Sequence, residues 1–362
     1  MIIHSIDYHH YHVPFRVPFT TSHGPVQYRE GTIIRVRTDD GLTGYGESAP
    51  LPAFGTGSPE ALRDVIEHLT EFLVGKPIEL ASMLIVASTH ARRDAPVRFA
   101  FDTAFLDIDA QKNGVSMSKL ISPDAVEEVP VNATISDMDT ERAASAASYA
   151  AMVGFQAIKM KVGVLGETSL EVERVAAVRE AIGPGVALRL DVNGVWTIER
   201  AIEMARALEP YQIDYLEQPL PAGYIGALGD LRKQINIPIA ADETATDIDT
   251  VQELIDHEAV DAIVIKPGII GGLSPSRELF DLASDNGIRV VVTTAIETGI
   301  AITAALHLAA TLPQPVSPCG LATGTLLETD LLVESSPIEG GMMKVPTGPG
   351  IGVTPVESIW QD

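Results

Sequence analysis

The sequence predicts an α/β fold in which a (β/α) barrel follows a smaller α+β domain. From about residue 126, short β-rich runs alternate with amphipathic helices, which is typical of parallel strands joined by helical crossovers. The polar residue that ends each run recurs at intervals of 30, 26, 25, 24 and 27 residues, the size of one strand–helix unit. The first 125 residues instead place strands before helices, which indicates a separate unit.

The N-terminal unit begins with strands and continues with a helix. β-favouring runs that contain Ile33 and Val36 precede the turn Asp39-Asp40-Gly41, and this pattern predicts an antiparallel hairpin. Residues 59–75 predict a helix because apolar side chains recur at offsets 0, 3, 4 and 7. These apolar residues are Leu62, Val65, Ile66 and Leu69.

The barrel is predicted from six β-rich runs, with a clear amphipathic helix at 198–208 between the second and the third. In a closed (β/α)₈ barrel the carboxyl ends of all strands converge on one face, so the residues that end these runs would ring a single pocket. An open doubly wound sheet is the alternative, in which the strand ends lie in a row. The runs are Ala157–Lys161, Val186–Asp191, Asp214–Glu217, Ile237–Asp242, Asp261–Lys266 and Arg289–Thr293.

Composition narrows the class of partner. The 362 residues carry 25 Lys and Arg against 49 Asp and Glu, and a net charge of −24 argues against a nucleic acid or an anionic membrane as partner. A single cysteine, Cys319, excludes an internal disulfide and a cysteine-based zinc site. We find neither a secretory signal nor a run of about 18 apolar residues. We therefore expect a cytoplasmic protein that binds a small molecule, and leave open a homo-oligomer.

Three of the residues that end successive runs are carboxylates: Asp191, Glu217 and Asp242. Two carboxylates at ~4 Å repel each other by about 4 kcal/mol at an effective dielectric constant near 20, so three together require protons or a cation. An all-oxygen set without His or Cys favours Mg²⁺ over zinc, with Mn²⁺ as the alternative ion. An acidic residue at a strand end also often caps the next helix, but three at this spacing favour a metal site.

Lysines end two further runs. Lys159 and Lys161 lie two residues apart in one strand, so both side chains point to the same side and enter the barrel, whereas Lys266 ends the Val-Ile-Lys run across the ring. Lysines that flank a divalent metal suit the removal of a proton next to a carboxylate, because the metal binds the carboxylate and a lysine takes the α-proton. We therefore assign Lys161, Lys266 and the supporting Lys159 as catalytic.

Together these segments resemble the muconate-lactonizing branch of the enolase superfamily, in which a Lys or His base works with Mg²⁺. The resemblance implies a modified TIM (β/α) barrel at 126–325 and an α+β capping domain at 1–125 that is completed by 326–362. It makes Asp191, Glu217 and Asp242 the metal ligands, with Lys161 and Lys266 on opposite faces of the substrate. The matching segments are Lys159–Lys161, Arg189–Asn193, Leu216–Pro219, Ala241–Glu243 and Ile265–Pro267. The residues that would support the ligands and lysines are Arg189, Asn193 and Glu243.

Further segments resemble the o-succinylbenzoate synthases of this branch. They are Arg29–Gly31, Gly44–Gly55, Thr293–Thr298 and Cys319–Gly324. Dipeptide epimerases of the branch carry an Asp-x-Asp motif near the eighth strand, which grips the substrate ammonium, and the stretch Leu326-Leu327-Glu328 does not complete it. Muconate cycloisomerases place a Glu nearby, and Ala322-Thr-Gly324 does not match that setting.

We therefore favour a lyase that dehydrates 2-succinyl-6-hydroxy-2,4-cyclohexadiene-1-carboxylate to o-succinylbenzoate, a step in menaquinone synthesis. Lys161 would remove the α-proton and protonate the departing hydroxyl, while Lys266 stays an ammonium that stabilises the enediolate. The alternatives are a racemase or epimerase of dipeptides or N-acylamino acids, in which Lys266 itself exchanges a proton, and a muconate-type cycloisomerase. A barrel retained as a binding or scaffold protein is the remote alternative.

Substrate choice is expected to come from the capping domain, because covering loops exclude water and contact the substrate. Residues 18–24 and 50–55 are predicted to cover the pocket, with Ser22 and Phe54 as contacts. At the ends of the seventh and eighth strands, Thr294 and Gly320 complete the predicted substrate-binding set.

Overall fold

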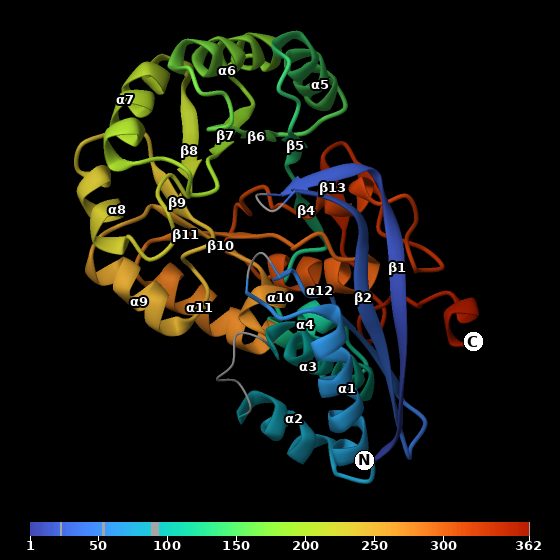
Figure 1. Cartoon of the computed structure of the whole chain (residues 1–362). Helices are drawn as coiled ribbons and strands as arrows, with labels where there is room; N and C mark the ends of the chain where they lie inside the picture. Colours follow the sequence, from blue (N-terminus) through green and yellow to red (C-terminus); the bar gives the residue numbers. More distant parts are fainter. Residues whose placement is uncertain (22–23, 53–54, 88–93, 362) are drawn as a thin grey trace.

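The computed structural model describes residues 1–361 apart from 22–23, 53–54 and 88–93, and it shows an α/β barrel with a capping unit at one side (Figure 1). The sequence-based fold prediction is thereby confirmed. No helix among the described residues is both long enough and apolar enough to span a bilayer.

The capping unit starts with a three-stranded antiparallel sheet in the order β1-β2-β3. Its strands are β1 (Ile3–Thr21), β2 (Gly24–Thr38) and β3 (Thr43–Ser48). The predicted hairpin is present, because β2 and β3 pair across the turn at Asp39-Asp40-Gly41. The lengths of β1 and β2 were not predicted: these two blue strands form a hairpin that stands beside the rest of the unit (Figure 1).

Four helices follow this sheet in the described part of the chain, and the third of them, which packs on the sheet, is buried almost throughout. They are α1 (Pro59–Leu73), α2 (Ile78–Ala87), α3 (Ala95–Asn113) and α4 (Met117–Ile121). The predicted helix at 59–75 is α1, which begins where the Ser58 side chain accepts a hydrogen bond from the Ala61 amide. Its buried face presents Leu62 and Ile66 to the core of the cap, which α3 completes from the other side.

The barrel sheet holds seven parallel strands in the order β11-β10-β9-β8-β7-β6-β5. The strands are β5 (Ala133–Ile135), β6 (Ala157–Lys161), β7 (Ala187–Asp191), β8 (Ile213–Glu217), β9 (Ile239–Ala241), β10 (Ala262–Ile265) and β11 (Arg289–Val292). All six predicted runs coincide with β6 to β11, because each is a short apolar-rich run whose polar last residue ends the strand or directly follows it.

Helices cover the outside of this sheet (Figure 1). They are α5 (Thr140–Met152), α6 (Thr168–Ile182), α7 (Ile198–Leu208), α8 (Ile225–Arg232), α9 (Ile248–Asp256), α11 (Leu273–Asp285) and α12 (Gly299–Ala309). The short helix α10 (Pro267–Ile270) instead lies at the carboxyl end of β10. The helix predicted at 198–208 is α7, with Thr197 as its N-cap. The described residues also form the short 3₁₀ helices η3 (Glu209–Tyr211), η4 (Ala322–Leu326) and η5 (Glu357–Trp360).

A two-residue segment closes the sheet into a barrel. Cys319 bridges Val131, just before β5, and Gly320 bridges Thr293, just after β11, both in parallel orientation. At Gly320 a side chain would collide with the Thr293 side chain, so the last strand can approach its neighbour only because this residue is glycine. Inside the barrel the core is built from small side chains around one aromatic ring: Tyr215, Ala240, Ala262, Val264 and Val291.

The C-terminal segment returns to the capping unit. β12 (Ile338–Glu339) and β13 (Met342–Lys344) form a small antiparallel sheet with β4 (Glu128–Pro130). Farther along, the Trp360 ring lies under the Arg35 guanidinium at 4.1 Å from the ring centroid. The Trp360 contact joins this segment to the cap, whereas β4 lies within the predicted barrel domain. The predicted domain boundaries stay a prediction.

His307 on α12 makes stability depend on pH. Its Nδ1 accepts a hydrogen bond from the Ser118 amide and its Nε2 donates to the Ile351 carbonyl, so both contacts require the neutral ring. Burial lowers the pKa of His307 to about 4. Below pH 6.5 this imidazole is therefore protonated in the unfolded chain, whereas in the folded chain it stays neutral down to about pH 4. The free energy of unfolding falls as the pH decreases between these values.

We expect this group to remove up to about 3 kcal/mol from the free energy of unfolding across that range. Urea unfolding of the wild type and of His307→Asn, measured from pH 7.5 to pH 4, tests this. The stability gap between them should narrow as the pH falls, since asparagine does not titrate. Burial raises the pKa of Asp107 to about 6, but both proteins contain Asp107, so its contribution to the pH dependence cancels in the comparison. A gap that stays constant with pH would contradict the assignment.

Candidate active site

Three of the predicted residues form one row across neighbouring strands. In the parallel register, Lys161 of β6 lies beside Asp191 of β7, and Asp191 lies beside Glu217 of β8. Asp242 directly follows β9, and Lys266 directly follows β10. The three strands that carry carboxylates thus lie between the two strands that carry Lys161 and Lys266. The convergence expected from the strand spacing is what the sheet produces.

Lys159 binds two of the three carboxylates. Its Nζ lies 2.5 Å from Glu217 Oε1 and 2.9 Å from Asp191 Oδ2, with all three side chains largely buried. Burial opposes the charge of Lys159, but Asp191, Glu217 and Asp242 outweigh it and raise its pKa well above the usual value. Burial also opposes ionisation of Asp191, yet the Lys159 ammonium lowers the pKa of that carboxyl. Lys159 is thus a counter-ion of Asp191, Glu217 and Asp242, which we call the acidic row.

Glu217 is the most deeply buried of the three carboxylates, at 1% exposure. Burial raises its pKa to about 8, with the negative charges of Asp191 and Asp242 adding to the effect against the opposing Lys159. Two ammonium groups, Lys159 and Lys266, therefore face three carboxyl groups. The cluster holds more acid than its own cations neutralise, which leaves room for a further positive charge.

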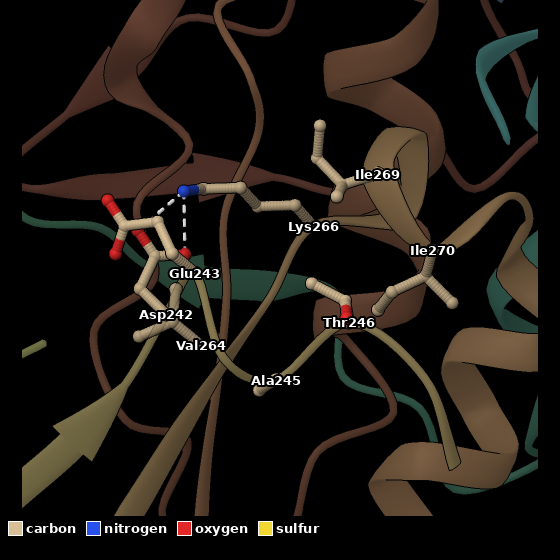
Figure 2. A pocket seen from close by; sticks show the side chains of 8 residues that line it. All are labelled: Asp242, Glu243, Ala245, Thr246, Val264, Lys266, Ile269 and Ile270. Atoms are coloured by element: carbon tan, nitrogen blue, oxygen red, sulfur yellow. Dashed lines mark hydrogen bonds and ion pairs between the residues drawn. The ribbon is translucent and has the colours of Figure 1, made fainter. Parts of the chain in front are cut away.

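Lys266 binds the third carboxylate. Its Nζ lies 2.6 and 2.5 Å from the two Asp242 oxygens, and Figure 2 shows the side chain reaching across the pocket toward Asp242, with Glu243 beside it. Asn193 Nδ2 donates to Glu243 Oε1 at 3.2 Å, and the Asn193 amide donates to Asp191 Oδ1 at 3.1 Å. Asn193 and Glu243 thus touch the row where they were predicted. The remaining residues that line this pocket are Ala245, Thr246, Val264, Ile269 and Ile270.

Lys161 differs from the other two lysines. Within the part of the chain that the structure describes, its ammonium has no ion-pair or hydrogen-bond partner, and its side chain is half-buried. The Lys161 backbone is nevertheless fixed, because Arg174 Nη2 donates to its carbonyl at 2.7 Å. Among the three lysines, Lys161 is the one whose amine is not committed to a carboxylate.

The donor chemistry of Asp191, Glu217 and Asp242 fits a hard divalent cation such as Mg²⁺, because all their ligand atoms are carboxylate oxygens. Their present arrangement is divided between two ammonium groups: among the described residues, no three His, Cys, Asp or Glu side chains gather closely enough to hold a metal ion. Lys159 already places a positive charge between the first two carboxylates. The residues therefore suit a cation by chemistry and by charge.

Comparison with known proteins gives the family. Residues 141–359 match the family model described as "Enolase C-terminal domain-like", and residues 5–122 match the mandelate racemase / muconate lactonizing enzyme N-terminal domain. The chain belongs to the muconate-lactonizing branch of the enolase superfamily. The sequence-based identification of this branch is therefore confirmed.

Relatives within the branch carry several activities. The N-succinyl-L-Arg/Lys racemase of Bacillus cereus is 31% identical over 82% of this chain and 81% of its own length. The o-succinylbenzoate synthase of Thermobifida fusca is 38% identical, but over only 56% of this chain and 62% of its own. The dipeptide epimerase of Cytophaga hutchinsonii, solved with Mg and the dipeptide D-Ala-L-Val, superposes with a TM-score of 0.90 at 28% identity, covering 99% of this chain and 97% of that one. All three names are those of enzymes.

Two features differ from what the branch pattern led us to expect. Arg189 does not touch the acidic row: it donates to Asp214 Oδ2 at 2.9 Å and to the Pro318 carbonyl at 2.5 Å, so it holds the start of the closing strand. That strand ends at Gly320, so the residues that follow it are Leu321 and Ala322, not Leu326-Leu327-Glu328. Neither Leu321 nor Ala322 is acidic, so these positions do not supply an Asp-x-Asp motif either.

The predicted substrate-binding residues have mixed outcomes. Thr294 is buried and its hydroxyl lies 2.6 Å from that of Thr323, and Gly320 accepts a hydrogen bond from the Thr293 hydroxyl. Both lie at the carboxyl ends of barrel strands, as expected. Ser22 and Phe54 lie outside the described residues. Contact of these four residues with a substrate stays a prediction.

Gln218 lies in the segment Leu216–Pro219 that resembles the family, but the sequence analysis assigned it no role in the site. Fully buried behind Glu217, it accepts hydrogen bonds from the amides of Asp242 and Thr244, at 3.0 and 3.2 Å, and donates to the Leu220 carbonyl. Gln218 thereby locks two neighbouring metal-ligand candidates to each other. Its position next to Glu217 was the one available signal.

Two residues of the cap hold the segment after β11. Both lie in segments that resemble the o-succinylbenzoate synthases, but the resemblance assigned neither of them a role. Arg29 donates to the Ile296 carbonyl at 2.9 Å and to the carbonyls of Ala49 and Pro50 at 2.6 Å each. Glu47 accepts from the Thr298 amide and hydroxyl at 2.8 Å and from the Ala301 amide at 3.1 Å, which caps the first turn of α12.

Proposed function

We propose that the chain is a Mg²⁺-dependent racemase that acts at the α-carbon of N-acylamino acids. The observation that carries the proposal is the order of the sheet, in which the acidic strands separate the strands of Lys161 and Lys266. A substrate carboxylate drawn to the acidic row would then meet one lysine on each face. Bound Mg²⁺ would lie against Asp191, Glu217 and Asp242, where it would neutralise the carboxylate and stabilise the enediolate charge.

The two lysines would divide the work. Lys161 takes the α-proton from one face, and its amine is the one not bound to a carboxylate. Lys266 is held as an ammonium, because Asp242 and Glu243 outweigh its burial and raise its pKa. It gives a proton to the opposite face and so inverts the centre. In the reverse direction the roles exchange, and Lys266 removes the proton.

Relatives support this assignment over dehydration. The racemase of Bacillus cereus and the dipeptide epimerase of Cytophaga hutchinsonii align over most of this chain, whereas the synthase of Thermobifida fusca aligns over little more than half. Neutral Leu321 and Ala322 after the closing strand offer no carboxylate to a substrate ammonium. An N-acylated amino acid carries no such ammonium, so we favour it over a free dipeptide.

o-Succinylbenzoate synthesis remains the second candidate, because the partial match to a synthase has the higher identity and because a fixed Lys266 ammonium suits that reaction as well. One experiment separates the two. Purified protein with Mg²⁺ in D₂O is given N-succinyl-L-phenylalanine, and α-deuteration and optical rotation are followed. In parallel it is given a dipeptide, whose α-deuteration is followed, and the cyclohexadiene carboxylate, whose absorbance is followed.

We expect deuteration and loss of optical rotation with the N-succinylamino acid. Dehydration of the cyclohexadiene carboxylate without racemisation of the N-succinylamino acid would show that the chain is a synthase and not a racemase. α-Exchange with dipeptides alone would favour an epimerase. Inactivity toward all three, in a protein that Mg²⁺ stabilises against heat, would exclude racemisation of this substrate class.

A further inference from the structure

The turn that follows Lys266 sets where this lysine stands. The Lys266 carbonyl accepts hydrogen bonds from the amides of Ile269 and Ile270, at 2.9 and 3.0 Å, which forms the short helix α10. The chain then passes through Gly271 and Gly272 and enters α11. A displacement of this turn therefore moves the Lys266 backbone directly.

Two side chains of helix α3, in the capping unit, form hydrogen bonds to this turn. Arg98 Nη2 donates to the Ile270 carbonyl at 3.1 Å. Asp102 Oδ2 accepts from the Leu273 amide at 2.6 Å and the Ser274 amide at 3.2 Å, and Asp102 Oδ1 accepts from the Ser274 hydroxyl at 2.8 Å. Both α3 side chains are only 5% exposed.

Asp102 does the work of a helix cap for α11. The N-cap position of α11 is Gly272, which has no side chain to accept the first amides, so Asp102 supplies the acceptor from another part of the chain. Added side chains at Gly271 and Gly272 would collide with Arg98 and Asp102, so α3 packs against the turn backbone itself. The contact is too close and too polar to be incidental packing.

The backbone at Lys161 is instead held by a helix of the barrel domain itself. Arg174 of α6 donates to the Lys161 carbonyl and pairs with Glu171 at 2.8 Å, both side chains being almost fully buried. Glu171 Oε1 in turn accepts from the amides of three residues that follow β6, at 2.8 to 3.1 Å. These residues are Gly163, Val164 and Leu165.

We infer that each lysine has its own positioning device: Arg98 and Asp102 of the capping unit position Lys266, and Glu171 and Arg174 of the barrel position Lys161. The inference rests on the proposed function where it assigns one lysine to each face of the substrate. Because a displacement of about 1 Å can cost as much as 10²-fold in rate, loosening one device weakens catalysis at one face. Asp102 and Glu171 are thus positioning residues for opposite faces.

Racemisation rates alone do not test this. Inversion in either direction uses both lysines, so a defect at one of them slows both directions equally. The informative measurement is exchange without inversion, in which the lysine that removed the proton returns a deuteron to the same face. N-succinyl-L-phenylalanine and its D-enantiomer, each incubated briefly in D₂O, report the two lysines separately. Lys161→Ala and Lys266→Ala identify which enantiomer belongs to which lysine.

The variants form a matched pair of carboxylate-to-amide changes. Asp102→Asn removes the charge that caps α11, and Glu171→Gln removes the charge that holds the loop after β6. Ser274→Ala is a milder variant, which deletes one hydrogen bond to Asp102 and is suited to a case where Asp102→Asn fails to fold. We expect the ratio of the two exchange rates to shift by roughly tenfold in one direction for Asp102→Asn and in the opposite direction for Glu171→Gln. Equal losses for both enantiomers, or shifts in the same direction, would overturn the inference.

A second readout does not depend on activity. Hydrogen–deuterium exchange of peptides covering 267–280 and 160–168 reports the two turns in the absence of substrate. Asp102→Asn and Ser274→Ala should speed exchange roughly fivefold in the first peptide only, and Glu171→Gln in the second only. Unchanged protection of 267–280 in both Asp102→Asn and Ser274→Ala would overturn the inference. If the wild type exchanges neither enantiomer, the proposed function fails, and this measurement alone decides whether the two turns are held separately.

Discussion

Lys161→Ala is expected to lower kcat for α-proton exchange by about 10²–10⁴-fold, the usual cost of losing a general base. Its amine lacks a partner among the described residues, whereas Lys159 and Lys266 are bound to carboxylates at 2.5 to 2.9 Å. No neighbouring lysine is therefore placed to replace it without breaking an ion pair. Deuterium incorporation into an N-succinylamino acid, followed by proton NMR, gives the rate.

Lys161→Arg is the matched variant, because arginine keeps the positive charge but does not give up its proton in this pH range. If Lys161 acts as the general base, Lys161→Arg should lose as much exchange activity as Lys161→Ala. Recovery of activity by arginine would instead assign Lys161 a purely electrostatic role. Retention of more than a tenth of wild-type exchange in Lys161→Ala would show that another group removes the proton. Thermal unfolding of each variant checks that the barrel remains intact.

Glu217→Gln is expected to abolish Mg²⁺ binding in calorimetry and activity with it, and Ala variants of Asp191 and Asp242 should do the same. The amide keeps the shape of the carboxyl but not the charge, and Mg²⁺ requires anionic oxygens in this set. Glu217 is central, because its strand β8 lies between the strand that ends at Asp191 and the strand that precedes Asp242. Loss of one of three carboxylates leaves too few oxygen ligands.

Asp230→Asn serves as the control, because this exposed carboxylate of α8 changes the net charge equally without touching the row. It should bind Mg²⁺ as the wild type does. A wild-type Mg²⁺ affinity in Glu217→Gln would remove this residue from the proposed ligand set. If Asp230→Asn also lost affinity for Mg²⁺, the binding would depend on the overall negative charge of the chain and not on this site.

Much of the barrel could be read from the sequence because its signals are local. The strands from β6 to β11 are mostly buried and rich in apolar residues, and each predicted run ends on a polar residue such as Asp191 or Lys266. The spacing of those ends then follows from the size of one strand–helix unit. Since parallel strands of a barrel end on one face, the meeting of residues 161 to 266 followed from topology alone.

The missed features depend on partners that are distant in sequence. Arg189 reaches Asp214 and Pro318, 25 and 129 positions away, so its strand gave no hint that it holds the closing segment. Only the family resemblance placed that segment at the eighth strand, because Cys319 and Gly320 alone form bridges, which are too few for any periodic pattern. Lys159 was placed on the correct side of β6, but its choice of Asp191 and Glu217 depends on side-chain reach between strands.

The contacts of Arg29 and Glu47 bear on how such a chain can change by recombination. A chimaera joined near residue 125, with the cap of one parent and the barrel of another, would need matching partners for both side chains. Without them the first amides of α12 lose their acceptor at Glu47, and the carbonyls of Ala295 and Ile296 lose Arg29. An exchange of either unit therefore requires matching substitutions in the other.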